Sequence, residues 1–350
     1  MPLIAPGRLH SFTVGVCRAL GSDEREATLV ADQLVDANLA GHDSHGVGML
    51  PTYVAMALAG RVAINRRPDL VVDAGPIAVL DGGGGFGQVA ALDATDVAVE
   101  RARAGGVAVI GLRNSFHIGR IGHWAERCCA AGLASIHFVN VTGHDPLVAP
   151  HGGAEARFGT NPFCAAVPGP DGRPLALLDM ATSKVAMGKV RVARNRGETI
   201  PDETVIADGR STTDPADMYD PDKTSALVAM GAHKGSGLAI ICELLGVALI
   251  GGPTTDESTK GMTTIVNNMV TIAIDPQALG TAESLLGDTV RYLDHVRSSP
   301  PRVGYDEVLA PGDPELRSRR ARAEGIDVDE TTLGELRQAA TAAGATVGLD

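Results

Sequence analysis

The chain has 350 residues, of which 44% are hydrophobic, 21% charged and only 3% aromatic. These values are ordinary for a globular enzyme with two or three structural units and an aliphatic core. The formal charge of −12 disfavours a nucleic-acid partner, because phosphate backbones require basic patches. We find no signal-peptide pattern and no apolar run that we judge long enough to span a bilayer, so no membrane location is expected.

The cysteines predict a reducing environment. Their number is odd and none of them shows CxxC spacing, so we expect neither a disulfide framework nor a zinc ribbon. A cytoplasmic location fits this pattern best. The five residues are Cys17, Cys128, Cys129, Cys164 and Cys242.

The first 60 residues are predicted to be helical. Apolar residues recur at helical spacing over 22–39, with Ser22 as the expected cap and Gly41 as the expected stop. A second apolar run begins after Gly46, which places Ser44 and His45 at its start. A helix N-terminus disfavours the imidazolium and orients the ring, so this polar turn is a candidate site for proton exchange.

A metal site in the same turn is disfavoured. His42, Asp43 and His45 have side chains of the kinds that bind zinc. However, adjacent side chains in a capping turn diverge, and no HExxH or CxxC motif accompanies them. We therefore expect no metal ion.

A glycine-rich loop over 82–87 resembles a dinucleotide fingerprint. It follows a predicted strand at 77–81 and precedes a predicted helix at 89–104 and a strand at 107–112, and Gly82-x-Gly84-x-x-Gly87 satisfies the spacing. The fingerprint also needs an acidic residue after the second strand, where this chain has Arg113-Asn114. We therefore favour a simple tight turn over a Rossmann cofactor loop.

The rest of the chain alternates helices and strands before a helical tail. This pattern predicts a helical domain made from 1–75 together with 285–350, and an α/β domain over 76–284. The expected helices are 121–131, 235–250, 315–324 and 332–343, the expected strands are 135–141 and 263–274, β-structure is expected at 165–180, and 201–223 is expected to be a surface connection.

Six polar motifs follow one another along nearly the whole chain, each of them weak evidence alone because turns and helix caps use the same residues. They are Asp43-Ser44-His45-Gly46, Asn114-Ser115-x-His117-x-Gly119, Gly159-Thr160-Asn161-Pro162, Asp179-Met180-Ala181-Thr182-Ser183, His233-Lys234-Gly235-x-Gly237-Leu238 and Pro311-Gly312-Asp313. Together they resemble the malate/L-lactate dehydrogenase family of nicotinamide-dependent 2-hydroxyacid oxidoreductases, and most closely its hydroxycarboxylate dehydrogenase B branch.

The resemblance implies a non-Rossmann α/β fold: a mixed β-sheet flanked by helices, with a helical unit formed from both chain termini. It also implies a homodimer that uses NAD or NADP and transfers hydride to or from C2 of a small 2-hydroxyacid or 2-oxoacid. Ureidoglycolate-type dehydrogenases and cyclic imino-acid reductases of the same family remain alternatives.

The resemblance also implies roles for individual residues. His45 matches the proton donor and acceptor, with Ser44 as its orienting partner, and His117 matches a second histidine to which some members assign that role. Thr160 matches a substrate contact, and we group Asn161 with it. The positions that match cofactor contacts are His117, Ile118, Gly119, Arg120, Ile121, Asp179, Met180, Ala181, Lys234, Pro311, Gly312 and Asp313.

Two positions depart from the family pattern. Many members have an arginine four residues after the first histidine, where it can pair with the substrate carboxylate, but here this position is Met49. We suggest Arg120 as the substitute, because the family usually has a small residue there. Lys189 stands where imine-reducing members tend to have an acidic residue, which lowers the likelihood of an imine reductase.

Overall fold

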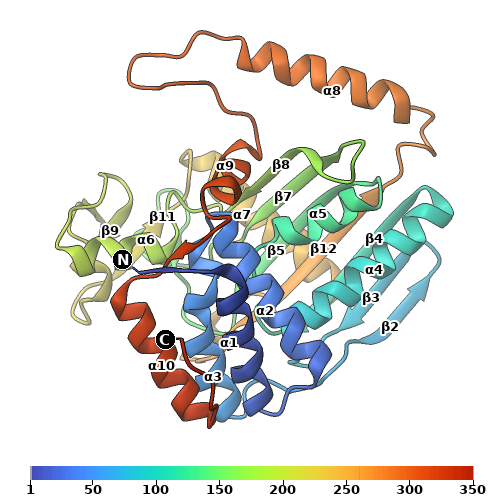
Figure 1. Ribbon diagram of the computed structural model, residues 1–350. Helices are drawn as coiled ribbons and strands as arrows, with labels where there is room; N and C mark the ends of the chain where they lie inside the picture. The colour runs from blue at the N-terminus through green and yellow to red at the C-terminus, as the bar shows by residue number, and fades with distance from the viewer. Residues whose placement is uncertain (1, 260, 350) are drawn as a thin grey trace. The chain divides into compact units, whose positions relative to one another are not determined.

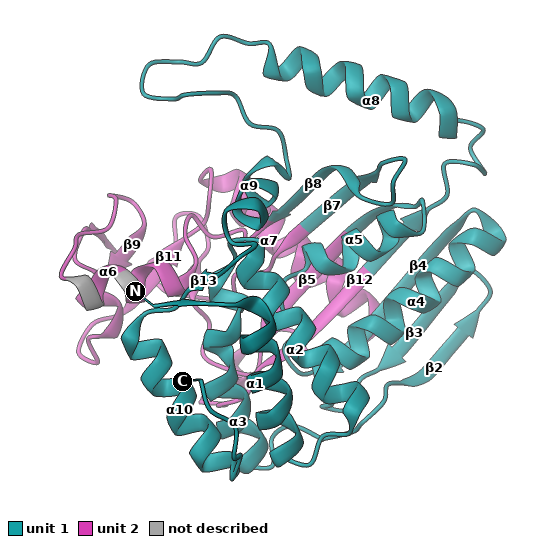
Figure 2. Ribbon diagram, viewed as in Figure 1, with its two compact units in different colours: residues 1–136, 164–179, 271–350 teal, residues 137–163, 180–270 magenta. Residues whose placement is uncertain are grey.

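The computed structural model describes residues 2–259 and 261–349, which divide into two compact units (Figures 1 and 2). Unit 1 contains residues 1–136, 164–179 and 271–350, and unit 2 contains 137–163 and 180–270. Both termini therefore belong to unit 1, as expected. The bounds differ from the expected domains because 76–136 packs with the terminal helices, for example through contacts of helix α2 (Glu24–Leu39) with helix α4 (Gly87–Gly105).

The helical part of unit 1 is built from both ends of the chain. Helix α1 (Pro6–Ala19) packs on α2, and helix α3 (Leu50–Leu58) packs on α10 (Glu330–Ala343). Asp23 caps α2 by accepting a hydrogen bond from the N–H of Glu26, so Ser22 is not the cap that we expected. The Ser22 hydroxyl instead donates to the Glu26 carboxylate, which also accepts from the N–H of Asn65.

One mixed sheet contains seven strands in the order β2-β3-β4-β12-β5-β7-β8. Strand β2 pairs antiparallel with β3, whereas β3 pairs parallel with β4 and α4 connects them. This mixed sheet with flanking helices confirms the expected fold class. The strands are β2 Asp69–Ala74, β3 Ile77–Asp81, β4 Val107–Ser115, β5 Ala134–Thr142, β7 Phe163–Pro168, β8 Pro174–Met180 and β12 Val266–Ile274.

Unit 2 has a small sheet in the order β10-β9-β11-β6. The segment 201–223, which we expected to be a surface connection, contributes two of these strands, because Val205 at the start of β9 is fully buried in the unit's core. The elements are β6 Val148–Ala149, β9 Val205–Ala207, β10 Arg210–Thr212, β11 Ser225–Val228, α6 Met187–Arg196 and α7 His233–Gly246.

The remaining elements of unit 1 connect its layers. Short strand β1 (Leu3–Ile4) pairs antiparallel with β13 (Ile326–Asp327), which joins the two ends of the chain. Helix α5 (Gly122–Ala130) follows β4, and α8 (Ala282–Arg297) and α9 (Asp313–Ala321) precede α10. Of the 16 residues of α8, only Leu293 is buried.

The stretch His233–Ile250 is long and apolar enough, by length and composition, to cross a membrane, contrary to our expectation from the sequence. Core helices pass the same test, and a third of this stretch is buried. Within unit 2, the carbonyl of Ala239 and the carboxylate of Glu243 both accept hydrogen bonds from the Asn161 amide. One side of the helix therefore packs within unit 2, whereas large aliphatic side chains such as Leu244 remain exposed.

Candidate active site

His45 lies in a 3-10 turn (Asp43–His45) between α2 and α3. Asn38 holds this turn in place. Its amide oxygen accepts a hydrogen bond from the N–H of Val47, and its amide nitrogen donates to the Asp43 carboxylate. A Cβ atom at Gly46 would lie 2.3 Å from the Asn38 amide oxygen, so only glycine permits this contact. The predicted turn 41–46 is therefore a rigid platform for one histidine.

His117 meets His45 from the end of β4. The Nδ1 atom of His45 lies 3.2 Å from Nε2 of His117, and the two rings are nearly parallel, with an interplanar angle of 8°. On its other side, Nδ1 of His117 lies 2.6 Å from the Tyr53 hydroxyl, which accepts a hydrogen bond from the Gln88 amide at 2.9 Å. The two candidate histidines thus form a dyad within unit 1.

Both rings of the dyad are held in the neutral form. Burial lowers the pKa of His45 to about 4, against the opposing charge of Asp179, and burial lowers the pKa of His117 to about 3. A neutral imidazole can accept a proton at ordinary pH. The dyad therefore has the electrostatic properties of a general base.

Ser44 does not orient His45 in this structure. Its side chain is exposed and shows no hydrogen bond among the described residues, whereas the inner nitrogen of His45 is held by His117. The orienting role that we expected for Ser44 is therefore performed by His117. The reason is geometric, because a 3-10 turn directs adjacent side chains away from each other.

The loop from His117 to Gly122 leads from β4 into α5 and is held by α2. The Gln33 amide donates to the carbonyl oxygen of Ile118 at 2.9 Å. Gly119 has a φ of +72°, and a Cβ atom there would lie 1.8 Å from the Gln33 amide oxygen. Among the described residues, the N–H groups of Gly119, Arg120 and Ile121 donate no backbone hydrogen bond. This loop can therefore receive an anionic group.

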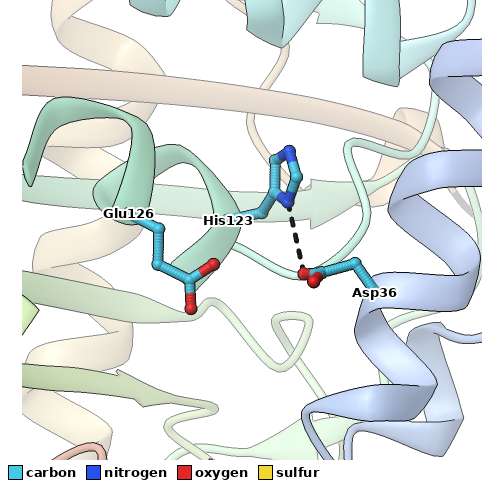
Figure 3. A group of neighbouring side chains, drawn as sticks. All are labelled: Asp36, His123 and Glu126. Carbon is cyan, nitrogen blue, oxygen red and sulfur yellow. Dashed lines mark hydrogen bonds and ion pairs between the residues drawn. The ribbon is translucent and has the colours of Figure 1, made fainter. Parts of the chain in front are cut away.

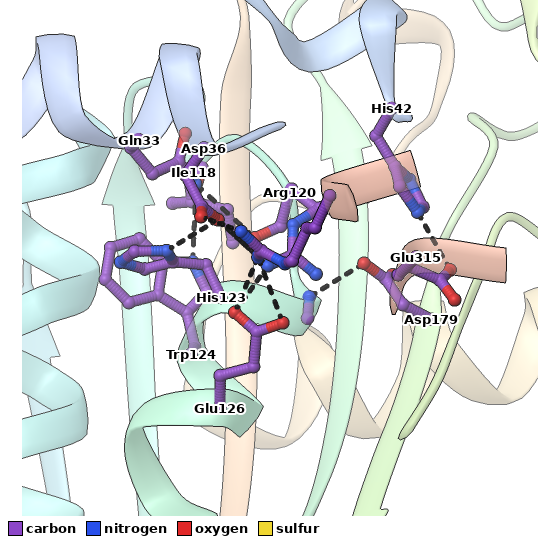
Figure 4. Close-up of polar contacts among 12 residues, drawn as sticks. Gln33, Asp36, His42, Ile118, Arg120, His123, Trp124, Glu126, Asp179 and Glu315 are labelled. Carbon is purple, nitrogen blue, oxygen red and sulfur yellow. Dashed lines mark hydrogen bonds and ion pairs between the residues drawn. The ribbon is translucent and has the colours of Figure 1, made fainter. Parts of the chain in front are cut away.

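Arg120 is buried in an ion-pair network that draws on three helices (Figure 4). Its Nη2 atom bonds Asp36 of α2 at 3.0 Å and Glu126 of α5 at 2.5 Å, and Arg319 of α9 bonds the same two carboxylates. Burial would lower the pKa of Arg120, but the charges of Glu126, Asp36 and Asp179 raise it above its usual range. Arg120 therefore stays charged.

Half of the Arg120 guanidinium has no partner. Its Nε and Nη1 atoms are buried and make no hydrogen bond within residues 2–259 and 261–349. Buried donors are normally paired, so these unpaired N–H groups indicate a missing acceptor. A Cβ atom at Gly122 would lie 2.4 Å from Nη1, so glycine leaves room for this nitrogen.

One group of side chains in this network has metal-binding geometry (Figure 3). Asp36, His123 and Glu126 each offer one ligand atom within 4.8 Å of the others. The carboxylates of Asp36 and Glu126 already pair with the guanidiniums of Arg120 and Arg319. Burial alone would raise the pKa of Asp36, but hydrogen bonds from His123 and Arg319 hold it well below its usual range. A cation here would face Arg120 and Arg319, so we interpret the group as an ion-pair network.

The other predicted residues of unit 1 support the loop. The Asp179 carboxylate accepts a hydrogen bond from the N–H of Gly122 at 2.8 Å, which ties the end of β8 to the start of α5. The carbonyl of Pro311 bonds the N–H of Leu177, and Gly312 has a φ of +99° directly before α9. The Asp313 carboxylate is occupied by Arg297 and by the N–H of Ala310.

The predicted residues of unit 2 form a separate group. Asn161 is fully buried, and its amide bonds Val141, Ala239 and Glu243, so its side chain has a structural task instead of the substrate contact that we expected. The carbonyl of Thr160 accepts two hydrogen bonds from Thr182, which leaves its hydroxyl available. Met180, Ala181 and Lys234 are at least partly exposed.

The glycine-rich loop at 82–87 is a closed turn. The N–H groups of Gly82 and Gly84 bond the carbonyls of Arg113 and Asn114, and that of Gly85 bonds Gly82. A Cβ atom at Gly85 would lie 2.7 Å from the carbonyl oxygen of Arg66. The glycines thus serve chain packing, in agreement with our prediction of a tight turn.

Several site residues were missing from the sequence analysis. Tyr53 and Gln88 complete the hydrogen bonds of the dyad, and Gln33, Asp36 and Glu126 hold the loop and Arg120. Tyr53 falls at an apolar helical position and Gln88 precedes an alanine-rich run, so both resemble ordinary helix residues. Only the double histidine motif could have directed attention to their neighbours.

Known proteins are similar to this chain over nearly its whole length. The sequence profile described as malate/L-lactate dehydrogenase matches residues 4–337. The chain belongs to the malate/L-lactate dehydrogenase family. Hydroxycarboxylate dehydrogenase B of Escherichia coli K12 is 47% identical over 328 residues, which covers 92% of this chain and 89% of that protein. Other relatives are named L-lactate, L-sulfolactate and malate dehydrogenases.

Solved structures of this family agree with the fold. A malate/lactate dehydrogenase-type structure from E. coli has a TM-score of 0.94 and 44% identity, covering 98% of this chain and 96% of its own. A delta1-piperideine-2-carboxylate reductase from Pseudomonas syringae has a TM-score of 0.81 and 28% identity, covering 97% and 100%. This malate/L-lactate dehydrogenase family member is therefore a nicotinamide-dependent oxidoreductase of the hydroxyacid dehydrogenase class.

Proposed function

We propose that the chain catalyses reversible hydride transfer at C2 of a small 2-hydroxyacid, with His45 as the group that exchanges the hydroxyl proton. One observation carries the assignment to His45 over His117. Both nitrogens of His117 are occupied, by His45 and by Tyr53. The Nε2 atom of His45 has no hydrogen-bond partner among the described residues, so it is the nitrogen available to a substrate.

Single substitutions of the two histidines test this assignment. We expect His45→Ala to lower kcat in both directions by roughly 10²–10⁴-fold, which is the usual contribution of general acid–base catalysis. His117→Ala should cost less, because it removes only the partner of the base. His10→Ala, a surface histidine paired with Asp32, serves as the control. A larger loss in His117→Ala than in His45→Ala would reverse the assignment.

The nicotinamide dinucleotide, NAD or NADP, fits the loop from His117 to Gly122. The N–H groups at 119–121, which donate no hydrogen bond among the described residues, suit its phosphate or carboxamide oxygens. The bound cofactor supplies the hydride acceptor or donor, and the protein orients the reacting carbon. We further assign it the expected contacts with Asp179, Met180 and Ala181, with Lys234, and with 311–313.

Arg120 is our candidate for the substrate carboxylate, since Met49 cannot bind one. The Nε and Nη1 atoms of Arg120 are buried without a partner among the described residues, so their N–H groups can donate to a carboxylate. Arg120→Lys keeps the charge that Asp36 and Glu126 require but loses these donors. The KM for a 2-oxoacid should rise roughly tenfold to a hundredfold.

Arg319→Lys is the matched control for Arg120→Lys. Arg319 belongs to the same network, and its Nη1 and Nη2 atoms already bond Asp36 and Glu126. We expect its substitution to leave the KM for 2-oxoacids unchanged. If Arg120→Lys also leaves this KM unchanged, the carboxylate must be held elsewhere, and Thr160 becomes the next candidate.

A substrate panel separates the remaining activities. Pyruvate, oxaloacetate, phenylpyruvate and 2-oxoglutarate should each be assayed with NADH and with NADPH. The alternatives are a cyclic imino-acid reductase, supported by the likeness to the P. syringae enzyme, and a ureidoglycolate-type dehydrogenase. We favour a 2-oxoacid because the proposed base and the unpaired donors of Arg120 suit it. Turnover of a cyclic imino acid with none of the 2-oxoacids would overturn this preference.

We also propose that the protein is a cytoplasmic homodimer. All five cysteines are free and buried, which is compatible with a reducing compartment. Helix α7 and the 3-10 helix Ala248–Ile250 that follows it expose large aliphatic side chains, and an exposed apolar patch of this kind commonly marks an interface. The residues are Ile240, Ile241, Leu244, Leu245 and Leu249. Leu244→Asp should therefore yield monomers in light-scattering measurements, whereas a dimer in this variant would place the interface elsewhere.

A further inference from the structure

A buried hydrogen-bonded chain extends from His45 into the core of unit 1. It runs from His45 through His117 and Tyr53 to Gln88, with contacts of 3.2, 2.6 and 2.9 Å. Tyr53 is fully buried, Gln88 is 1% exposed, and the Tyr53 ring packs edge-on against Phe116. The chain ends at Gln88, because the other amide atom, Oε1, has no partner among the described residues.

The orientation of the Gln88 amide sets the direction of all the hydrogen bonds in this series. With the Gln88 N–H donating to the Tyr53 hydroxyl oxygen, as in this structure, the Tyr53 O–H is directed to Nδ1 of His117. His117 then carries its proton on Nε2 and donates it to Nδ1 of His45. In this arrangement His117 accepts a hydrogen bond from Tyr53, and the dyad stays neutral.

A half-turn of the Gln88 amide reverses every bond. Its oxygen then accepts from the Tyr53 O–H, the Tyr53 oxygen accepts from Nδ1–H of His117, and Nε2 of His117 accepts from Nδ1–H of His45. No other hydrogen bond opposes this half-turn, because Oε1 of Gln88 has no partner to lose among the described residues. Only in this second arrangement can the dyad gain a proton without two donors facing each other within the hydrogen-bonded series.

We propose that Tyr53 and Gln88 are positioning residues that couple proton uptake by the His45–His117 dyad to a half-turn of the Gln88 amide. This inference rests on the proposed role of His45. In oxidation, the O–H and C2–H bonds of the substrate break and a C2=O bond forms; Nε2 of His45 takes the proton, and a bound nicotinamide would accept the hydride with its two electrons. The Nδ1 proton of His45 then shifts to His117, whose positive charge is stabilised by Tyr53. Reduction reverses these steps.

Two nearly isosteric substitutions of Gln88 test the proposal. When ionised, the carboxylate of Gln88→Glu accepts a hydrogen bond from the Tyr53 hydroxyl. It therefore favours the protonated form of the His45–His117 dyad. The acid limb of kcat/KM for hydroxyacid oxidation should move up by roughly one pH unit or more. Gln88→Met provides no acceptor, so the protonated dyad is destabilised, and the limb should move down or stay while the rate falls roughly tenfold to a hundredfold.

The Tyr53 hydroxyl must carry this effect. In a Tyr53→Phe background the chain is interrupted, so Gln88→Glu should displace the acid limb by less than half as much as in the parent. Nitrogen-15 NMR of the imidazoles at neutral pH provides a readout without turnover. We expect imidazolium or shared-proton signals for the dyad in Gln88→Glu, and neutral rings in the parent and in Gln88→Met.

The outcomes separate this inference from the proposed function. If Gln88→Glu and Gln88→Met both lower the rate with no displacement of the acid limb, the two residues have only a packing role and the inference is wrong. An equal displacement with and without the Tyr53 hydroxyl would also overturn it, since the effect would then act through space. The proposed function fails by a different result, namely full activity of His45→Ala.

Discussion

Two strand-to-helix junctions of unit 1 look alike in sequence and differ in structure. The first joins β3 to α4 through Gly82–Gly87, and the second joins β4 to α5 through His117–Gly122. In the first, the N–H groups of Gly82, Gly84 and Gly85 are all bonded to backbone carbonyls. In the second, the N–H groups at 119–121 donate no hydrogen bond to any described residue, and the buried Arg120 has two nitrogens without a described partner.

The spacing of glycines alone therefore does not identify a ligand-binding loop. What distinguishes the two junctions is whether their backbone N–H groups are already bonded within the protein. The two junctions also depend on each other. Gly85 accepts a hydrogen bond from the N–H of Phe116, and a Cβ atom at Gly87 would lie 2.2 Å from the carbonyl oxygen of His117. The glycine-rich turn therefore packs against the second junction, and we expect the second junction alone to provide the binding surface.

Among the glycine substitutions in the two junctions, the largest effect is expected from Gly119→Ala in the second. The new Cβ would collide with the Gln33 amide, which is itself held by the carbonyl of Ile118, so the loop must move. A displacement of about 1 Å can cost roughly 10²-fold in rate, and we expect a loss of this size in kcat/KM with weaker binding of NADH and NADPH. Fluorescence titration of the reduced cofactors measures the binding, and unchanged affinity would contradict our assignment of this loop.

The two junctions should also differ in their response to acid. Burial lowers the folded-state pKa of His117 to about 3, so the unfolded chain binds the proton first. Stability is therefore lost as pH falls below about 6.5, by about 2 kcal/mol between pH 7 and pH 5 for this one histidine. The first junction contains Asp81. Despite some burial, hydrogen bonds from Asn114 and Gly83 lower its pKa, so its contribution is lost only below the ordinary carboxyl range.

Urea unfolding at pH 7 and pH 5 measures this difference. His117→Asn, which cannot gain the proton, should lose less stability over this interval than the parent, whereas Asp81→Asn should match the parent. His45 and His137, whose pKa values burial lowers to about 4 and about 3, add to the parent's loss in both backgrounds. An identical pH dependence in His117→Asn and the parent would show that His117 is not buried and neutral.

Local patterns in the sequence predicted most helices and strands and the positions of the polar motifs. The strand 135–141 and the helix 332–343 agree with β5 and α10 within two residues, because apolar periodicity is a local signal. Pairings over long separations could not be predicted. The bond from Arg319 to Asp36 spans 283 residues, and that from Tyr53 to His117 spans 64. In neither pair does the sequence around the two residues contain a pattern that predicts the contact.

The smallest effect is expected from Gly84→Ala in the first junction, and it is the sharpest control for Gly119→Ala. The two glycines have nearly the same φ, +71° and +72°, so alanine meets the same backbone strain of about 1–3 kcal/mol at either position. A Cβ atom at Gly84 meets nothing within 4 Å, however. Gly84→Ala should lower the melting temperature modestly and leave cofactor affinity and kcat unchanged. A Rossmann-type loop would lose the cofactor on the same substitution, so this variant separates a closed turn from a ligand loop by binding alone.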